Sequence, residues 1–196
     1  MKLFLNIKRL VLIGLISVLW ASCCPPYEDS KVLPVTLWPQ ETGMWCWAAS
    51  GQMCMDYLGN NVSQCTQANN RYPKTTCCNT PTPNDCVLGG WPEFNKYNFT
   101  SLNTVNAPLS WDKIRSEIDC KNRPFTYTWH WAGNGGHMVA IVGYSIGECN
   151  DEMFLHVQNP LPVNVGSIYT ITYDAYVAGN PGSSHWNDYY EITPTN

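Results

Sequence analysis

Cys46 is the residue of this sequence with the strongest chemical potential. It lies in the segment QETGMWCWAA at residues 40–49, where a stretch of helical composition begins. Backbone N–H groups and the helix dipole favour an anion at a helix start, so the position is predicted to lower the pKa of the thiol and favour the thiolate. The amide of Gln40 can fold back over Gly43 and, with the N–H of Cys46, donate hydrogen bonds to an oxyanion. These residues predict nucleophilic attack on a carbonyl group.

A general base and an orienting partner for it follow later in the chain. His137 comes after Gly-Asn-Gly-Gly and opens a predicted strand, and Asn159 ends the next predicted strand. Antiparallel neighbours of this length bring the two ends together, so the amide could accept from one ring nitrogen and leave the other facing Cys46. Because Asn before Pro is also an ordinary turn signal, Asn150 and Asn164 remain alternatives.

The elements that must position these residues form a helical part followed by a β-rich part. Composition with cap or stop signals predicts helices and one helical turn at 45–58, 62–70, 91–97 and 110–119. Aromatic and β-branched residues predict strands at 124–131, 138–144, 153–158, 168–173 and 186–192. This order indicates an α+β fold with an N-terminal helical lobe at about 40–110, a C-terminal antiparallel β lobe at about 120–196, and the active-site cleft between them.

The first 22 residues are typical of an export signal. Three basic residues precede an apolar stretch of 12 residues at 10–21, shorter than the roughly 20 residues that a membrane-spanning helix needs. Cys23-Cys-Pro-Pro follows and resembles a bacterial lipoprotein signal. We expect a signal peptide at 1–22, a lipid anchor at Cys23, and a tether and lead-in at 23–39. The mature protein would be a cell-envelope lipoprotein on the outer surface or the periplasmic face, or otherwise a secreted protein.

The ten cysteines are consistent with export, because disulfides persist in an oxidising compartment. If Cys23 is lipidated and Cys46 is a free thiol, an even set of eight remains, and most are expected to be bridged. Cys77, Cys78 and Cys86 lie in a loop without periodicity, where cross-links can substitute for a core. The sequence has no C-x-x-C and no H-E-x-x-H motif, so we predict no metal and no organic cofactor.

The charge balance excludes one large class of partners. Removing residues 1–22 lowers Lys plus Arg from 11 to 8 against 15 Asp plus Glu. Nucleic-acid affinity depends on Lys and Arg that neutralise phosphates, so this acidic chain is predicted not to bind nucleic acid. The expected partner is a peptide or protein substrate, with membrane association through the lipid anchor alone, and the protein is expected to be a monomer.

Taken together, these residues resemble the papain-like cysteine peptidases, in particular the short bacterial secreted branch that includes the staphopains. The shared features are Gln-x5-Cys-Trp, a Gly-His pair before an apolar strand, and a later Asn, and the likeness extends from about residue 40 to residue 191. The resemblance implies a two-lobe peptidase domain at 40–196. It also implies that Gln40 donates to the oxyanion, Cys46 is the nucleophile, His137 is the base and acid, and Asn159 orients His137.

A second segment resembles the substrate-binding part of this family. Cys86-Val-Leu-Gly-Gly-Trp-Pro is similar to the family's Cys-x-Gly-Gly-x-Pro, with one extra residue after the cysteine. In the family this glycine backbone pairs with the bound peptide like an added strand, which implies substrate binding by Gly89, Gly90 and Trp91. Gly136 is expected to leave the backbone beside His137 uncovered by a side chain, so that substrate can approach it. The alternative is that Gly89 and Gly90 are turn glycines.

The predicted function is a thiol-dependent peptidase that hydrolyses peptide bonds through an acyl-enzyme thioester. Papain-like zymogens carry a long inhibitory segment, for which the residues between Cys23 and Cys46 leave no room. We therefore expect control by location, partner or substrate.

The same triad also serves amidases, deamidases and acyl transferases. A cysteine in an apolar helix is often an inert core residue. The rival hypothesis is therefore a disulfide-braced lipoprotein that binds peptide or glycan in a Trp-rich cleft without turnover.

Overall fold

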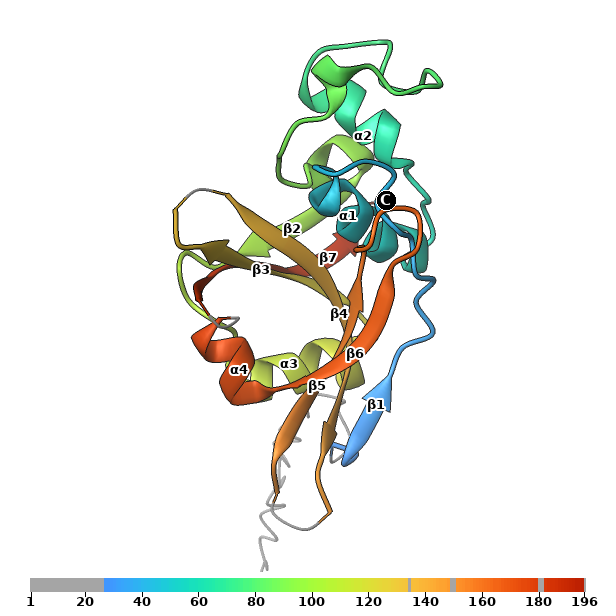
Figure 1. The fold of residues 1–196 in the computed structure, drawn as a ribbon. Helices are drawn as coiled ribbons and strands as arrows, with labels where there is room; N and C mark the ends of the chain where they lie inside the picture. The colour runs from blue at the N-terminus through green and yellow to red at the C-terminus, as the bar shows by residue number, and fades with distance from the viewer. Residues whose placement is uncertain (1–26, 134, 149–150, 180–181, 196) are drawn as a thin grey trace, which may run out of the picture.

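The computed structural model describes residues 27–133, 135–148, 151–179 and 182–195 (Figure 1). The signal peptide, Cys23 and Asn150 lie outside the described residues. The elements follow in the order β1 (Ser30–Val32), α1 (Cys46–Tyr57), α2 (Gln64–Arg71), 3-10 turns η1 (Asn84–Cys86) and η2 (Phe94–Tyr97), β2 (Phe99–Asn103), α3 (Trp111–Arg115), π-helical turn η3 (Ser116–Cys120), β3 (Phe125–Trp131), β4 (Gly136–Ile146), β5 (Met153–Asn159), β6 (Ser167–Thr172), α4 (Tyr173–Ala178) and β7 (Ser183–Pro194). In the described part of the chain, no helix has the length and apolar character that a membrane span requires.

Seven strands of the described chain form one antiparallel sheet in the order β2-β7-β3-β4-β5-β6. The short strand β1 pairs with the far end of β4, beyond the stretch of β4 that pairs with β3. A Cβ atom at Gly143 would lie 2.6 Å from the carbonyl oxygen of Lys31, so glycine is required where β1 crosses β4. The pairing of β3 with β4 begins with Gly136 opposite His130, and His137 follows opposite Trp129.

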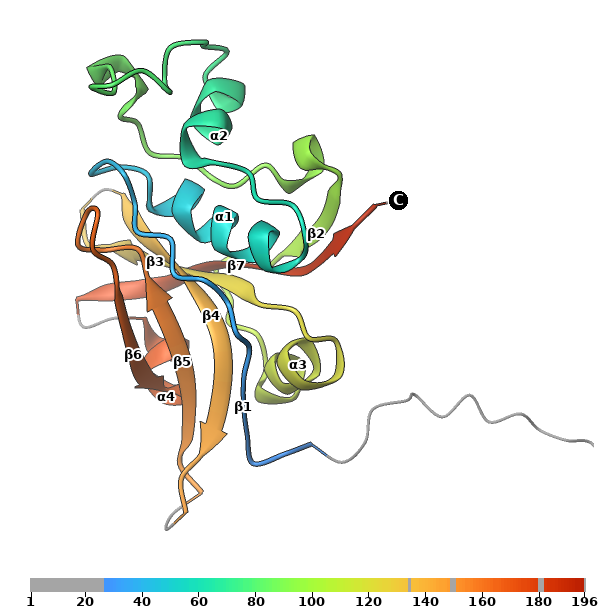
Figure 2. The same cartoon turned by 90° about the vertical axis from the view of Figure 1, so that its right-hand side faces the viewer.

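Helix α1 is buried along most of its length and lies against β3 and β4 (Figure 2). Every residue from Trp47 to Met55 is buried, as is typical of a central helix, and the buried polar side chains of Ser50 and Gln52 are hydrogen-bonded. The Ser50 hydroxyl lies one turn beyond Cys46 and donates a hydrogen bond to the carbonyl of Met138 at 3.1 Å. This bond fixes the beginning of α1 beside the beginning of β4, where His137 lies.

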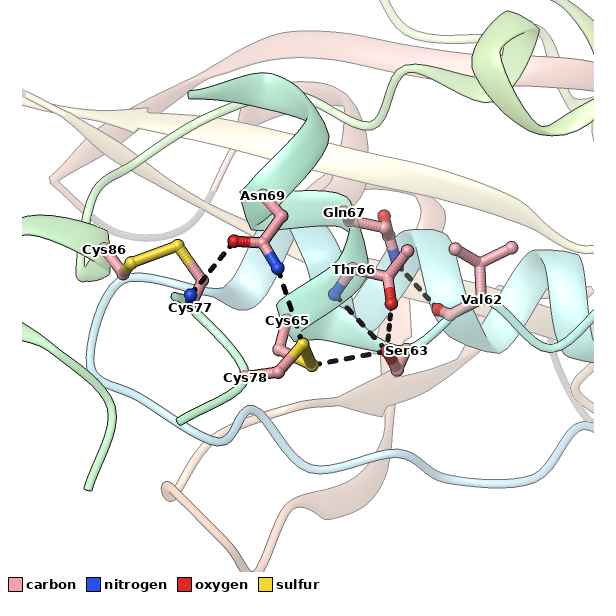
Figure 3. Close-up of a disulfide and its surroundings, with 9 residues drawn as sticks. All are labelled: Val62, Ser63, Cys65, Thr66, Gln67, Asn69, Cys77, Cys78 and Cys86. Atoms are coloured by element: carbon pink, nitrogen blue, oxygen red, sulfur yellow. Dashed lines mark hydrogen bonds between the residues drawn. A yellow bond between two sulfur atoms is a disulfide. The ribbon is translucent and has the colours of Figure 1, made fainter. Parts of the chain in front are cut away.

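The loop between α2 and β2 is held by cross-links (Figure 3). Disulfides join Cys65 to Cys78 and Cys77 to Cys86, so the expected cross-linking of this loop is confirmed. The side-chain oxygen of Asn69 accepts a hydrogen bond from the Cys77 N–H at 2.9 Å. Beneath the loop lies a small second core that consists of Trp45, Trp47, Ala48, Ala68, Cys77, Cys86 and Met138.

Two cysteines of the described chain are free, Cys46 and the fully buried Cys54 of α1. Cys54 belongs to the set of eight left for pairing, of which most were expected to be bridged, and it is not bridged. Burial raises the pKa of the Cys54 thiol, which makes it unreactive. Its sequence context is apolar and helical, as is that of Cys46, and only the packing separates the two.

The predicted α+β fold is confirmed, with the helices α1 and α2 gathered at one end of the sheet (Figure 1). All five predicted strands are present, and Ser63 and Ser110 cap α2 and α3 with their side chains. The division into lobes needs correction, because β2 lies within the predicted helical lobe and yet pairs with β7. Along β2 the sequence FTSLN shows no alternation of apolar and polar residues, so no strand was predicted there.

We predict that removing the disulfide between Cys77 and Cys86 destabilises the protein. The double variant Cys77→Ser/Cys86→Ser should lower the free energy of unfolding by about 2–3 kcal/mol, because the bond restricts the unfolded chain. The corresponding fall in Tm is roughly 5–10 °C, measured by calorimetry. Cys54→Ala, which removes a thiol and no cross-link, is the control and should lower Tm by less. Equal Tm values for wild type and the double variant would contradict the prediction.

Candidate active site

A cavity of about 480 Å³ lies between the beginning of α1, the loop that ends at Trp91, and the beginning of β4. It brings together six residues predicted from the sequence: Cys46, Gly89, Gly90, Trp91, Gly136 and His137. Among the described residues, the rest of the lining is Gly43, Met44, Trp47, Arg71, Thr128, Trp131, Gly135, Met138, Leu161 and Trp186. The helical part and the sheet therefore face one another across a mostly apolar cleft.

Cys46 is the first residue of α1 and is partly buried. Burial raises the pKa of its thiol, while the backbone N–H groups of Met138, Trp47 and Cys46 itself act in the opposite direction. The net rise corrects the sequence prediction of a lowered pKa. That prediction considered the helix start alone, and the cost of placing an anion at a buried position outweighs it.

His137 and Asn159 are joined by a hydrogen bond of 2.7 Å between Nε2 and Oδ1. The amide oxygen can only accept, so Nε2 carries the proton and Nδ1 is left with its lone pair. The N–H of Leu161 donates to the same oxygen at 3.0 Å, which fixes the orientation of the amide. Asn164 occupies a different position, where its N–H donates to the carbonyl of Gln40.

Aromatic rings enclose His137, which is 3% exposed. Trp129 meets the imidazole edge-on with a centroid distance of 5.0 Å, and Trp131 lies parallel to it at 6.3 Å. Burial lowers the pKa of His137, and the hydrogen bond to Asn159 acts in the opposite direction. At pH 7 the imidazole is therefore neutral and able to accept a proton.

Gln40 does not line the cavity, although it was predicted to face the oxyanion. Its Nε2 donates to the carbonyl of Thr42 at 2.6 Å, and the N–H of Trp45 shares this acceptor. The amide thus lies against the turn that leads into α1, with one N–H still available. Its backbone N–H donates to the carbonyl of Pro160, which ties this turn to the end of β5.

The wall formed by Gly89 and Gly90 is held by side chains from the helical part. Trp45 Nε1 donates to the carbonyl of Cys86 at 2.9 Å, and Trp47 Nε1 donates to that of Leu88 at 3.2 Å. The Tyr72 hydroxyl donates to the carbonyl of Gly89. These three bonds align the carbonyls of the wall toward the helices.

Neither Gly89 nor Gly90 has a positive φ, so no left-handed turn conformation requires glycine at either position. Close approach requires glycine at 90 instead. A Cβ atom there would lie 2.6 Å from Nε of Arg71 and 2.8 Å from the ring of Trp47. Gly136 is equally constrained, since its Cβ would lie 2.2 Å from the carbonyl oxygen of Trp129.

Several lining residues were not predicted from the sequence, among them Arg71, Thr128, Leu161 and Trp186. Arg71 is the last residue of a short polar helix, and no motif surrounds it.

His185 was predicted to be structural without a partner, but its Nε2 lies 3.2 Å from Oδ2 of the buried Asp188. This pair is outside the cavity lining. No group of three or more His, Cys, Asp or Glu in the described chain could hold a metal ion.

Comparison with known proteins agrees with this architecture. Residues 32–192 match the family described as Peptidase_C39 like. The chain is similar to digestive procathepsin L 3 from the larval midgut of Tenebrio molitor, with a TM-score of 0.51, 10% identity, and coverage of 90% of this chain and 73% of that one. This likeness shows the papain-like two-lobe fold.

A second similar structure is the proform of the ragweed pollen allergen Amb a 11, a cysteine protease. Its TM-score is 0.48 at 15% identity, and the alignment covers 87% of this chain. The chain spans 66% of that protein's length. No curated protein shows significant similarity to this chain.

We predict that Asn159 controls the protonation of His137. Asn159→Ala removes an acceptor that favours the imidazolium, so the pKa of His137 should fall further, with its protonation equilibrium shifted about fivefold. Asn159→Asp, which places a carboxylate at the same distance, should raise this pKa. NMR titration of the ring protons measures both changes. An unchanged pKa in Asn159→Ala would contradict the prediction, and Asn164→Ala is the matched control.

Proposed function

Because this chain belongs to the Peptidase_C39 like family, we propose that it is a cysteine peptidase that hydrolyses peptide bonds through Cys46, His137 and Asn159. The observation that carries the proposal is the 2.7 Å bond between His137 and Asn159 beside a cleft that also contains a free cysteine at a helix start. Nucleophile, base and orienting group are the three roles that acyl transfer by a thiol requires.

In the proposed mechanism, the resting pair is a thiol and a neutral imidazole. His137 Nδ1 takes the proton of Cys46 as the sulfur attacks the carbonyl carbon of the substrate. The tetrahedral intermediate collapses when His137 returns this proton to the leaving amine, which forms a thioester. His137 then takes a proton from water, the hydroxide attacks the thioester, and the proton returns to the sulfur as the acid is released.

Two donors are proposed for the oxyanion. The first is the backbone N–H of Cys46, which faces the sulfur. The second is the remaining N–H of Gln40, whose amide lies against the turn that precedes α1 and outside the cavity lining, so it must turn toward the cleft when substrate binds. The N–H of Cys46 is held by α1 and stabilises the developing charge without reorganisation, and loss of one oxyanion donor costs about 10²–10³ in kcat.

The substrate is proposed to pair with Gly89 and Gly90 as an added strand. Support comes from the three side-chain bonds that fix the carbonyls of residues 86, 88 and 89, and from the absence of side chains at the two glycines. Trp91 and Trp186, with ring centroids 4.6 Å apart, would form one end of the subsite.

Export is proposed as well, with a signal peptide at 1–22 and a lipid anchor at Cys23. Two disulfides in the described chain support an oxidising compartment, where such bonds persist. An amidase, a deamidase or an acyl transferase would use the same groups. The amide that is cleaved distinguishes an amidase or a deamidase from a peptidase, and an acyl acceptor other than water distinguishes a transferase.

We predict that an epoxysuccinyl thiol inhibitor forms a single covalent adduct at Cys46, detected by intact mass and peptide mapping. Cys46→Ala should abolish the adduct, and His137→Ala should slow its formation by at least about 10²-fold because the proton acceptor is lost. Cys54→Ala is the matched control and should react like wild type, since Cys54 is buried. Absence of an adduct on folded protein would reject the peptidase proposal and favour the binding lipoprotein.

We also predict that Gly90→Ala weakens substrate binding. The added methyl group must displace Arg71 or Trp47, which disturbs the wall, so KM for peptide hydrolysis should rise about tenfold or more with a smaller change in kcat. Alkylation by iodoacetamide, which is too small to need the wall, should proceed at the wild-type rate. Unchanged KM would remove Gly90 from the proposed binding site.

A further inference from the structure

Among the described residues that line the cavity, Arg71 is the one with a permanent charge. It is the last residue of α2, and 27% of its side chain is exposed. The remainder of the lining is glycine, aromatic or otherwise largely apolar. A cation in such surroundings is costly unless an anion accompanies it, so the pairing of Arg71 decides what it can bind.

The guanidinium of Arg71 is incompletely paired. Its nearest acid is Glu93, with 3.6 Å between Nη1 and Oε1, which is too long for a hydrogen bond. Lys96 lies closer to the same carboxylate, at 2.9 Å. The Tyr72 hydroxyl accepts a hydrogen bond from Arg71, and Nε is buried without a partner among the described residues. Because 27% of the side chain is exposed, a ligand can reach the remaining donors of the guanidinium.

Aromatic rings hold the guanidinium in place. Its carbon lies 5.8 Å from the ring centroid of Trp47 and 5.9 Å from that of Tyr72. Burial raises the pKa of the Tyr72 hydroxyl, and the charge of Arg71 opposes this rise. Tyr72 also donates to the carbonyl of Gly89, so Arg71 is fixed relative to the glycine wall.

Arg71 can enter the cleft because Gly90 has no side chain. A Cβ atom at this position would lie 2.7 Å from Cδ and 2.6 Å from Nε of Arg71. The stem of the arginine thus passes directly against the backbone on which the peptide is proposed to pair. A second cavity of about 510 Å³ shares Arg71 and Trp91 with the first, so Arg71 lies at their junction.

We infer that Arg71 binds a carboxylate of the substrate, so that the protein prefers peptides with an acidic group on the side that pairs with Gly89 and Gly90. The inference rests on the proposed function and names its substrate class. Arginine presents a planar set of donors that matches a carboxylate with two parallel bonds. The carboxylate belongs either to a Glu or Asp side chain or to the end of the substrate chain, and the two sources are separable by experiment.

The test compares peptides that differ in a single charge. Glu or Gln is placed at each of six positions in an otherwise neutral peptide, and each peptide is prepared with a free or an amidated carboxyl terminus. We expect kcat/KM to be about tenfold higher for Glu than for Gln at one position, or for the free terminus over the amide. Arg71→Gln should reduce this ratio to about one, and the ratio separates the effect of charge from any general effect of the substitution on the wall.

Lys74→Gln is the matched control, because Lys74 is close to Arg71 in the chain, pairs with Asp85 and lines neither cavity. It should keep the wild-type ratio. A ratio near one at every position in wild type would overturn the inference, as would an equal loss for all peptides in Arg71→Gln, which indicates a role in holding the wall alone.

Binding provides a readout that does not depend on turnover. Cys46→Ala should bind the preferred acidic peptide about tenfold more tightly than its Gln counterpart, and the difference should vanish in Cys46→Ala/Arg71→Gln. Equal affinities would overturn the inference. Failure of the epoxysuccinyl reaction at Cys46, together with retained charge preference in binding, would reject the peptidase and leave Arg71 as a carboxylate site.

Discussion

Two indole N–H groups, one on each side of Cys46, determine the geometry of the whole cleft. Trp45 and Trp47 donate to the carbonyls of Cys86 and Leu88, so the glycine wall is positioned from the same helical turn that carries the thiol. The hydroxyl of Ser50 attaches this turn to β4 beside His137. The distances between nucleophile, base and wall are therefore all set from one turn of α1, and any change in its packing alters them together.

Burial of this turn has an electrostatic cost. It raises the pKa of Cys46 and lowers the pKa of His137, so each group by itself favours its neutral form. Transfer of a proton between them leaves the net charge of the cleft unchanged. The N–H groups around the sulfur and the amide oxygen of Asn159 stabilise the separated charges from opposite ends. The site is consequently suited to proton transfer during attack rather than before it.

Much of the arrangement could be predicted from the sequence, since it depends on local signals. His137 opens β4 and Asn159 ends β5, and the β-branched and aromatic pattern defines both strands. What the sequence did not predict depends on tertiary packing. The pKa of Cys46 reflects the closure of the cleft, and Arg71 enters the cavity through the space left at Gly90. Strand β2 is recognisable only from its pairing with β7.

The loop from residue 72 to residue 90 is joined to the helices by the disulfide from Cys65 to Cys78 and by the two indole hydrogen bonds, and it is closed on itself by the disulfide from Cys77 to Cys86 and the Tyr72 hydroxyl. Its intervening side chains contribute little to the core. Most of its sequence is thus free to diverge during evolution without moving the glycine wall. Relatives of this protein can therefore differ in the sequence of this loop, and with it in substrate preference, while the catalytic groups keep their positions.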